Sequence, residues 1–276
     1  MNVGIVGIGL MGGSLALSLR ELNYVDKIYG SDHNKEHCES AIKLNLVDEI
    51  VDFETITKCD LIVLAVPVNG VISILKELVH VDESTTIIDL GSTKKIIVDN
   101  VPPQIRENFV ALHPMAGREN FGPQAAIKDL YKDSVVVFCD IENSAQLHRD
   151  RAIKIFTDLK MKLHYMEADA HDRHAAFISH MPHLISYSIA NTVLAQEDKH
   201  SILTLAAGGF RSMSRLAKSS PNMWEDIFRQ NKKNLVEALD LFEAELKNLR
   251  QDVESEKWDD VNNSLKNANK LYDIFS

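Results

Sequence analysis

The sequence predicts an α/β protein in which a doubly wound, mostly parallel sheet is followed by an all-α C-terminal domain. Through residue 166, short runs rich in Val, Ile and Leu alternate with amphipathic stretches, which is the pattern of strands and covering helices. A glycine-rich segment follows the first of these apolar runs. Beyond residue 166 the apolar residues recur only at helical spacing, so we expect no further strands.

The expected strands are short and hydrophobic along their whole length. Strands of this kind lie in parallel sheets that helices cover on both faces. They fall at residues 2–6, 27–31, 61–66, 85–90, 109–112, 134–139 and 162–166. Helices are expected between them, at residues 11–23, 34–44, 70–79, 93–100 and 144–159.

Two long amphipathic helices are expected at the C-terminus. The first presents one apolar stripe, whose members recur at steps of three and four residues: Leu235, Leu239, Phe242, Leu246 and Leu249. The second covers residues 256–274. The change from strands to helices divides the chain into domains 1–167 and 168–276. We expect the C-terminal helices to build a dimerisation domain and to provide the surface of a homodimer.

The composition argues against several classes of protein. A formal charge of −10 without a dense run of Lys or Arg disfavours nucleic-acid binding, which needs a cationic surface. No segment is long and apolar enough to span a membrane. Cys38, Cys59 and Cys139 form no CxxC pair, so neither a disulfide framework nor a cysteine metal site is expected. We therefore expect a cytoplasmic protein with reduced thiols.

The segment GIVGIGLMGGSLA has the G-x-G-x-x-G spacing of a dinucleotide-binding loop, at Gly7, Gly9 and Gly12. In this Rossmann-type motif the glycines permit a tight turn, a close approach of the backbone to the pyrophosphate, and tight packing of helix on strand. Leu10 and Met11 lie in the same loop, and the helix that follows offers unpaired N–H groups to the phosphates. The alternative is a glycine-rich turn that only packs a helix.

Asp32 ends the second expected strand, twenty residues after Gly12. An acid at this position accepts the ribose hydroxyls of NAD and repels the additional phosphate of NADP, so NAD is the expected cofactor. His33 and Lys35 nearby leave some tolerance for NADP. A solvated strand end is the alternative interpretation of Asp32.

Three further strand ends supply candidate residues, because ligands of open α/β sheets lie beyond the carboxyl ends of the strands. Val66 and Pro67 close one strand and are expected at the cofactor. Ser92 follows another strand and faces cofactor or substrate, or alternatively caps the next helix. His113 follows a third, where a histidine near the nicotinamide can accept the proton of an alcohol during oxidation. A loop histidine without a chemical role is the alternative.

Two later segments carry candidate substrate-binding residues. AHDRHAAFISHMPHLI contains four histidines, of which His180 and His183 share one helix face. We expect them to contact a carboxylate-bearing substrate or to be satisfied at a domain interface. No metal is expected, because there is no HExxH pattern. GGFRSMSRLAKSSPNMW places Arg211 and Arg215 one turn apart, before Trp224. Arginine grips carboxylates through paired donors, and a solvated cationic face is the alternative.

In this order, the segments GIVGIGLMGGSLA, VPV, DLGSTK, LHPMAGREN, SHMPHL and GGFRSMSRLAKSSPNMW resemble the prephenate dehydrogenase (TyrA) family of tyrosine biosynthesis. The resemblance covers about residues 1–235. It implies an oxidoreductase that uses NAD to convert prephenate to 4-hydroxyphenylpyruvate by oxidative decarboxylation. It also implies a homodimer formed by the helical domain, with the active site in the cleft between the domains.

The resemblance implies roles for individual residues as well. His113, the histidine of HPMAG, is the catalytic partner of the substrate's ring hydroxyl, and Ser92 bonds to that histidine and hydroxyl. The expected substrate-binding residues are His180, His183, Glu119, Arg215 and Trp224. Of these, His183 and Arg215 bind substrate carboxylates, and Glu119 orients Arg215.

Several alternatives stay open. Ser212 stands where many relatives carry an acid, and Arg118 and Phe121 stand where relatives often carry smaller or polar residues. Arogenate, or both substrates as in a cyclohexadienyl dehydrogenase, is therefore an alternative to prephenate. Another Rossmann reductase, such as a β-hydroxyacid dehydrogenase, would need a catalytic lysine in the helical domain, where none stands in a convincing context. A non-catalytic NAD-sensing dimer would not need His113.

Overall fold

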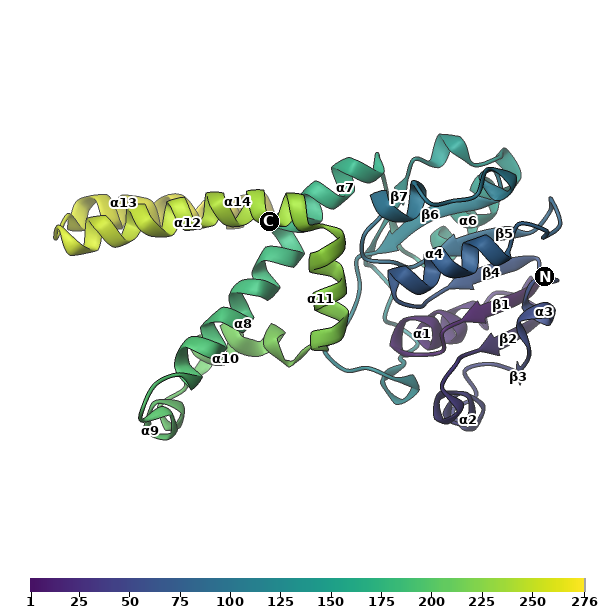
Figure 1. Cartoon of the computed structure of the whole chain (residues 1–276), viewed down its shortest axis with the longest axis horizontal. Helices are drawn as coiled ribbons and strands as arrows, with labels where there is room; N and C mark the ends of the chain where they lie inside the picture. The colour runs from purple at the N-terminus through teal and green to yellow at the C-terminus, as the bar shows by residue number, and fades with distance from the viewer. Residues whose placement is uncertain (276) are drawn as a thin grey trace. The chain divides into compact units, whose positions relative to one another are not determined.

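The structure is a computed structural model that describes residues 1–275. It contains two compact units, one running from Met1 to Asn231 and one beginning at Lys232. The first unit is built on a single eight-stranded sheet (Figure 1). A mostly parallel sheet followed by helices is the predicted fold class, which the structure confirms. No helix within residues 1–275 is long and apolar enough to cross a membrane.

The sheet has the doubly wound order β3-β2-β1-β4-β5-β6-β7-β8, in which only β6 and β7 are antiparallel. Its strands are β1 (Asn2–Val6), β2 (Lys27–Ser31), β3 (Glu49–Ile50), β4 (Leu61–Leu64), β5 (Thr86–Asp89), β6 (Phe109–Pro114), β7 (Val135–Cys139) and β8 (Lys162–Met166). The chain leaves β1 and β4 in opposite directions across the sheet, and ligands of such folds bind at this switch point.

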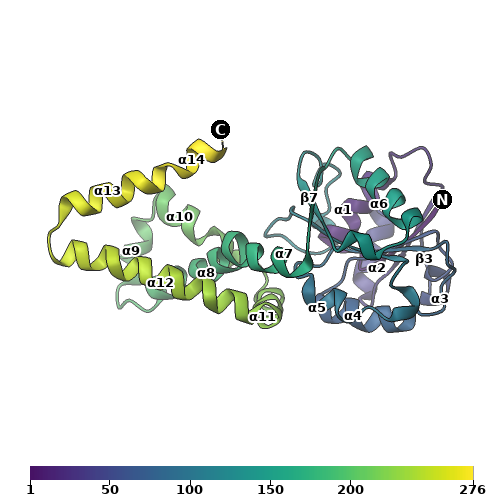
Figure 2. The same ribbon diagram turned by 90° about the horizontal axis from the view of Figure 1, so that it is seen from above.

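Helices cover both faces of the sheet, as the unbroken apolar strands predict. One face carries α1 (Leu10–Leu19), α2 (Lys35–Lys43) and α6 (Gln146–Asp158), and the other carries α3 (Phe53–Ile56), α4 (Val68–Glu77) and α5 (Lys95–Val98). Figure 2 shows α6 on one side and α4 and α5 on the other. Short 3₁₀ turns lie at Pro103–Ile105, Pro123–Ala125 and Ile141–Asn143.

The rest of the first unit is helical. It consists of α7 (Ala168–Ala175), a π-helical turn η4 (Ala176–His180), α8 (Met181–Leu194), α9 (Lys199–Thr204), α10 (Gly208–Ser214), a 3₁₀ turn η5 (Arg215–Lys218) and α11 (Pro221–Gln230). The π-turn connects α7 directly to α8, and Pro182 follows it. Proline has no N–H to donate, so the regular α-helical hydrogen bonds are interrupted here. Turns of this kind are frequent at functional sites.

The second unit contains α12 (Lys232–Glu254), α13 (Trp258–Asn269) and α14 (Leu271–Phe275). The predicted helix over residues 256–274 is thus two helices, interrupted at Lys270. Along the chain, the boundary between the two units falls after residue 231. The predicted domain limit at residue 167 lies instead at the end of the last strand. The limit at 167 rests on the change from strands to helices, whereas the boundary at 231 rests on how densely the parts are packed. The two boundaries describe different properties, so the limit at 167 stays a prediction.

Candidate active site

The loop between β1 and α1 contains three glycines. At two of them a side chain would clash with the backbone, and at the third there is free space around the backbone. Gly7 has φ +92°, and a Cβ on it would lie 2.4 Å from the carbonyl oxygen of Ala65. A Cβ on Gly12 would lie 2.0 Å from the carbonyl oxygen of Gly7. A Cβ on Gly9, which precedes α1, would meet nothing within 4 Å. The open backbone at Gly9 fits the close approach of a pyrophosphate.

Asp32 follows β2 and is bonded to the glycine loop. Its Oδ2 accepts the backbone N–H of Ile8 at 3.0 Å, and its Oδ1 accepts that of Asn34 at 2.9 Å. The Nδ1 atoms of His33 and His37 each lie 3.4 Å from this carboxylate. Since each carboxylate oxygen can accept more than one hydrogen bond, Asp32 retains capacity for the hydroxyls of a ribose.

The other residues predicted at the cofactor gather at the switch point of the sheet. Leu10 is buried and Met11 is half-buried, both in the first turn of α1. Val66 is half-buried, with Cγ1 2.8 Å from the position of a Cβ on Gly7, and the exposed Pro67 precedes α4. Met11, Val66 and Pro67 have no atom within 4 Å of the position of a Cβ on Gly9.

His113 lies near the end of β6, at the carboxyl edge of the parallel strands. Its Nδ1 is 2.9 Å from Nε2 of His171 on α7, and Nδ1 of His171 is 2.8 Å from Oδ1 of Asp172. Burial lowers the pKa of His113 well below its ordinary value, and His171, Lys94 and His180 add to this effect. The imidazole is therefore neutral at neutral pH, as a proton acceptor must be.

A buried ion pair holds the strand that carries His113. Lys94 and Asp89 have no exposed surface and are bonded to each other. Lys94 Nζ also donates to the carbonyl oxygen of Leu112 at 2.8 Å, while Asp89 Oδ1 accepts the N–H of Leu112 at 3.3 Å. The backbone N–H and carbonyl groups of Leu112 are thus bonded to Asp89, at the end of β5, and to Lys94, which precedes α5.

Ser92 is half-buried in the loop between β5 and α5. Within residues 1–275, its side chain makes no hydrogen bond to His113 and does not cap the helix. The backbone N–H groups of Lys94 and Lys95 donate instead to Asp172, at 2.7 and 3.0 Å. The helix-cap alternative for Ser92 is therefore wrong, because an acid from α7 already occupies that position.

His180 and His183 converge on the buried ring of Trp224. The rings of His183 and Trp224 are stacked with centroids 3.6 Å apart, and the ring of His180 meets Trp224 edge-on at 6.1 Å. Burial lowers the pKa of His180 to about 4. The Nε1 of Trp224 is buried and has no hydrogen-bond partner within residues 1–275. A buried donor of this kind suits a ligand that brings an acceptor.

Arg215 and Glu119 form an ion pair at the exposed rim of this region. Arg215 Nη1 lies 3.3 Å from Glu119 Oε1, and the arginine side chain is 55% exposed. The glutamate's own backbone N–H and Arg215 lower the pKa of Glu119. Arg211 donates instead to the carbonyl oxygen of Ala206 at 3.2 Å, and Arg118 is exposed. Among Arg118, Arg211 and Arg215, it is Arg215 that forms an ion pair with an acid within residues 1–275.

The four histidines of the predicted segment do not form a metal site. His174 is exposed, and His171 and His180 are buried with other partners. Within residues 1–275, no three His, Cys, Asp or Glu side chains are arranged to hold a metal ion.

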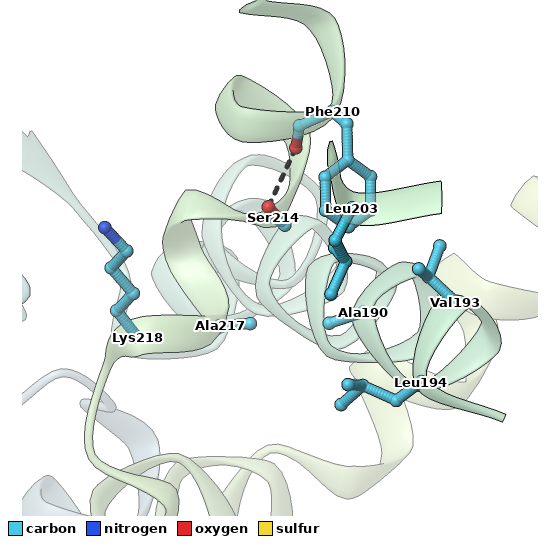
Figure 3. Close-up of a pocket in the computed structure, with 8 residues that line it drawn as sticks. All are labelled: Ala190, Val193, Leu194, Leu203, Phe210, Ser214, Ala217 and Lys218. Atoms are coloured by element: carbon cyan, nitrogen blue, oxygen red, sulfur yellow. Dashed lines mark hydrogen bonds between the residues drawn. The ribbon is translucent and has the colours of Figure 1, made fainter. Parts of the chain in front are cut away.

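An apolar hollow of about 220 Å³ lies between α8, α9 and α10 (Figure 3). Val193, Leu194, Leu203 and Phe210 line it, and Ser214 donates to the carbonyl oxygen of Phe210 at 2.8 Å. None of the predicted site residues lines this hollow. Its lining offers few groups for chemistry, so the histidine cluster is the candidate active site.

Sequence reasoning missed part of the hydrogen-bonded network. Asp89 and Lys94 stand in the DLGSTK segment, and Asp172 in AHDRHAAF, but the sequence predicts no role for them. His171 is expected there only as one of four histidines that contact a substrate or a domain interface. A charged residue in a run of buried strand residues, as Asp89 is, was the available signal for a buried pair. The contact between His171 and His113 joins residues 58 positions apart, and no local pattern indicates it.

Two family models match the chain. The model for the nucleotide-binding domain of prephenate dehydrogenase matches residues 15–165, and the model for the dimerization domain of prephenate dehydrogenase matches residues 167–267. Among curated proteins, the cyclohexadienyl dehydrogenase of Zymomonas mobilis is 32% identical over 285 residues, covering 98% of this chain and 94% of that protein. The prephenate dehydrogenase of Bacillus subtilis is 29% identical over 276 residues, covering 98% of this chain and 74% of that protein.

Solved structures give the same result. The prephenate dehydrogenase of Aquifex aeolicus, in complex with hydroxyphenyl propionate and NAD+, is similar with a TM-score of 0.93 at 30% identity, covering 100% of this chain and 98% of that one. The arogenate dehydrogenase of Synechocystis has a TM-score of 0.83 at 24% identity, covering 100% of both chains. At that identity the likeness supports the fold alone.

Proposed function

Because the chain belongs to the prephenate dehydrogenase family, we propose that it catalyses the NAD-dependent oxidative decarboxylation of prephenate to 4-hydroxyphenylpyruvate. The observation that carries the proposal is the position of His113 at the carboxyl end of β6, where burial lowers the pKa of its imidazole well below the ordinary value. This end lies on the same edge of the sheet as the glycine loop and Ser92. A proton acceptor is thus available beside the place where a nicotinamide would lie.

The chain's own residues fit NAD. The open backbone at Gly9 accommodates the pyrophosphate, and the carboxylate of Asp32 accepts the ribose hydroxyls while disfavouring an additional phosphate. When bound, NAD supplies the acceptor for the hydride that leaves the ring carbon of the substrate. The relative from Aquifex aeolicus was solved with NAD+, which supports this assignment.

In the proposed reaction, His113 removes the proton of the ring hydroxyl as the ring carbon is oxidised. Burial keeps the imidazole unprotonated, and the bonds of Lys94 and Asp89 to Leu112 hold its strand in place. The ring carboxylate then leaves as carbon dioxide, because its loss makes the ring aromatic. Ser92, beside the same strand ends, is the second group proposed to contact the hydroxyl.

The substrate's carboxylates are proposed to lie near Trp224 and Arg215. Arg215 offers guanidinium donors at the rim, and Nε1 of Trp224 is a buried donor that needs an acceptor. His183 Nδ1 lies 2.8 Å from the carbonyl oxygen of Ser179, so this nitrogen carries a proton and donates. For His183 to bind a carboxylate through Nε2, the ring must therefore take up a second proton.

Arogenate is the second candidate substrate, because one of the relatives is a cyclohexadienyl dehydrogenase. Arogenate carries an ammonium group where prephenate carries a keto group. An ammonium group needs an acidic partner, and the acid at the rim, Glu119, is already bonded to Arg215. Residue 212, in the GGFRS segment, is a serine, so it adds no second carboxylate. This charge balance favours prephenate.

We also propose a homodimer formed through the C-terminal helices. The matched model over residues 167–267 is that of a dimerization domain. Several apolar side chains of α12, α13 and α14 are exposed: Leu241, Leu246, Leu265, Leu271 and Ile274. Exposed apolar surface of this extent is characteristic of an interface. Sedimentation of the purified chain should give the mass of two copies, and a monomer at high concentration would contradict the proposal.

A substrate comparison tests the proposed function. Purified protein with NAD and prephenate should form NADH and 4-hydroxyphenylpyruvate, and arogenate should react more slowly. His113→Asn should reduce turnover by about 10²- to 10⁴-fold while NAD still binds. His164→Asn is the matched control, because His164 is an exposed histidine of β8. Full turnover in His113→Asn would exclude the base, and reaction with arogenate alone would exclude prephenate.

A further inference from the structure

A chain of hydrogen-bonded side chains ends at His113. It begins at the Asp172 carboxylate, continues through Nδ1 and Nε2 of His171, and reaches Nδ1 of His113, with contacts of 2.8 and 2.9 Å. His171 and Asp172 are buried. Asp172 is bonded to His171 and His171 to His113, so both would act on a substrate only through His113.

The positions of the protons in this chain follow from its acceptor end. The oxygens of Asp172 accept the backbone N–H groups of Lys94 and Lys95, so the carboxylate is an acceptor and His171 Nδ1 must donate to it. A neutral imidazole has one N–H, and its other nitrogen is an acceptor. His171 Nε2 therefore accepts, and His113 Nδ1 must donate to it. The remaining nitrogen of His113, Nε2, is left without a proton.

We propose that His171 and Asp172 are positioning residues that fix the tautomer of His113, with Nδ1 protonated and Nε2 free to accept the substrate's proton. The use of His113 as a base rests on the proposed function, but the tautomer does not. Which ring nitrogen of a histidine carries its proton is set by the hydrogen bond that the other nitrogen makes. A histidine at the end of β6 without this chain would be free to adopt the unproductive tautomer.

The same chain stabilises the charge that forms during the reaction. When Nε2 of His113 takes the proton of the ring hydroxyl, the ring becomes an imidazolium whose Nδ1–H is still donated to His171. That second proton can move to His171 Nε2, which places the positive charge beside the Asp172 carboxylate. No electrons are exchanged, and one proton enters the chain.

The surroundings of His113 make this carboxylate necessary. The groups that face it from neighbouring elements are Lys94 before α5, His171 on α7 and His180 on η4, and each opposes a positive charge on its ring. Asp89 is bonded to Lys94. Asp172 is the acid bonded to the histidine chain itself, and it offsets the charge that the reaction creates.

The position of Asp172 is determined on several sides. Its side chain accepts two backbone N–H groups, and its backbone carbonyl accepts Nδ2 of Asn231 at 2.6 Å. The same Asn231 nitrogen lies 3.0 Å from Nδ1 of His180. The carboxylate is thus held between α5, α7 and the end of α11, which keeps the direction of the histidine chain constant.

The tautomer can be read directly from long-range ¹H–¹⁵N correlation spectra of the histidine rings in the full-length protein at neutral pH. The His113 resonances are assigned as those absent from His113→Asn. We expect protonated Nδ1 and unprotonated Nε2 for His113 in the wild-type protein. A proton on Nε2 would overturn the proposal, and this outcome does not depend on whether the His171 variants fold.

Two variants at His171 add a kinetic test. His171→Phe removes the acceptor, so His113 should lose its fixed tautomer, and kcat should fall by about 10²- to 10⁴-fold with an unchanged KM; a wrong histidine tautomer costs about 10⁴-fold in a serine protease. His171→Gln keeps an acceptor oxygen and should recover part of this loss. His174→Phe, an exposed position on α7, is the matched control. Unchanged kcat in His171→Phe would overturn the proposal.

These outcomes separate the present proposal from the proposed function. The spectrum is recorded without substrate, so it does not depend on which compound the enzyme oxidises. Inactivity toward both prephenate and arogenate, with the expected tautomer, would refute the proposed function and support the positioning role. Full activity of the wild-type protein with a protonated His113 Nε2 would support the proposed function and refute the positioning role.

Discussion

The buried pair of Lys94 and Asp89 allows a sharp test, the substitution Lys94→Met. Methionine has similar length and no charge, so it fills the space of the lysine stem while the ammonium group is lost. The side chains of both residues have no exposed surface, so solvent cannot replace the lost partner. Asp89 is then left buried without its counter-charge, and the carbonyl oxygen of Leu112 loses its donor.

The expected cost follows from this burial. Removing one partner of a buried ion pair destabilises a protein by about 3–5 kcal/mol. For a unit of this size, 1 kcal/mol corresponds to a change of about 2–4 °C in Tm. Lys94→Met should therefore lower Tm by roughly 6–20 °C. Turnover of the remaining folded protein should also fall, because Leu112 directly precedes His113.

Lys95→Met is the matched control in the neighbouring position. Lys95 forms an exposed i,i+4 pair with Asp99, and pairs of this kind contribute only about 0.3–0.5 kcal/mol. Urea and thermal unfolding should be measured at one protein concentration, since dimer formation makes both concentration-dependent. The double variant Asp89→Asn/Lys94→Met should be more stable than Lys94→Met, because it leaves no unpaired charge.

The comparison of Lys94→Met with Lys95→Met tests whether Lys94 and Asp89 form a buried, charged pair. If Lys94→Met and Lys95→Met have free energies of unfolding within about 1 kcal/mol of each other, the pair is not the buried, charged contact described above. If the double variant is less stable than Lys94→Met, the cost comes from lost packing rather than from an unpaired charge.

Three further predictions concern cofactor and substrate. Gly9→Ala should leave Tm unchanged but weaken NAD binding in a titration, whereas Gly12→Ala should destabilise the fold, because its Cβ would lie 2.0 Å from a backbone carbonyl oxygen; equal Tm values for the two variants would refute this. Burial lowers the pKa of His183 below its ordinary value, and a carboxylate needs the protonated ring. The KM for prephenate should therefore already rise with pH below about 6.5, the ordinary histidine pKa, and a profile that is as steep in His183→Asn would contradict this. Arg215→Ala should raise KM with little change in kcat, as loss of uniform binding does, while Arg211→Ala should change neither; a fall in kcat alone would be the wrong result.

The sheet could be predicted because strand residues buried on both faces leave an unmistakable apolar run. β1, β2 and β8 occupy the predicted residues, and β4 and β5 differ by one or two residues at their ends. β3 was missed, since two residues are too few to show any pattern. The antiparallel direction of β7 was not predicted either, because a buried strand has the same composition in both directions.

The residues of the candidate site that stand in sequence motifs could be predicted. Those that belong to the site only through contacts in the folded structure could not. His113, Arg215 and Trp224 stand in segments that the family resemblance marks. His171 and Asp172 are buried residues of α7, but the exposed residues of the same helix, such as His174, are of the same polar types. Helical periodicity cannot distinguish a solvated polar face from one buried against strand ends, so these two residues required the three-dimensional structure.

The two parts of the site differ in how freely they can change. The parts proposed for the chemistry are buried and share partners: the acid that orients the histidine chain also binds the start of α5, and Lys94 both neutralises Asp89 and holds the strand of His113. A substitution there disturbs stability and proton transfer together. The pair of Arg215 and Glu119 is exposed, so substitutions there cost little stability. If Arg215 and Glu119 bind substrate as proposed, substitutions at this pair should change substrate preference at little cost in stability, whereas substitutions in the buried network should not.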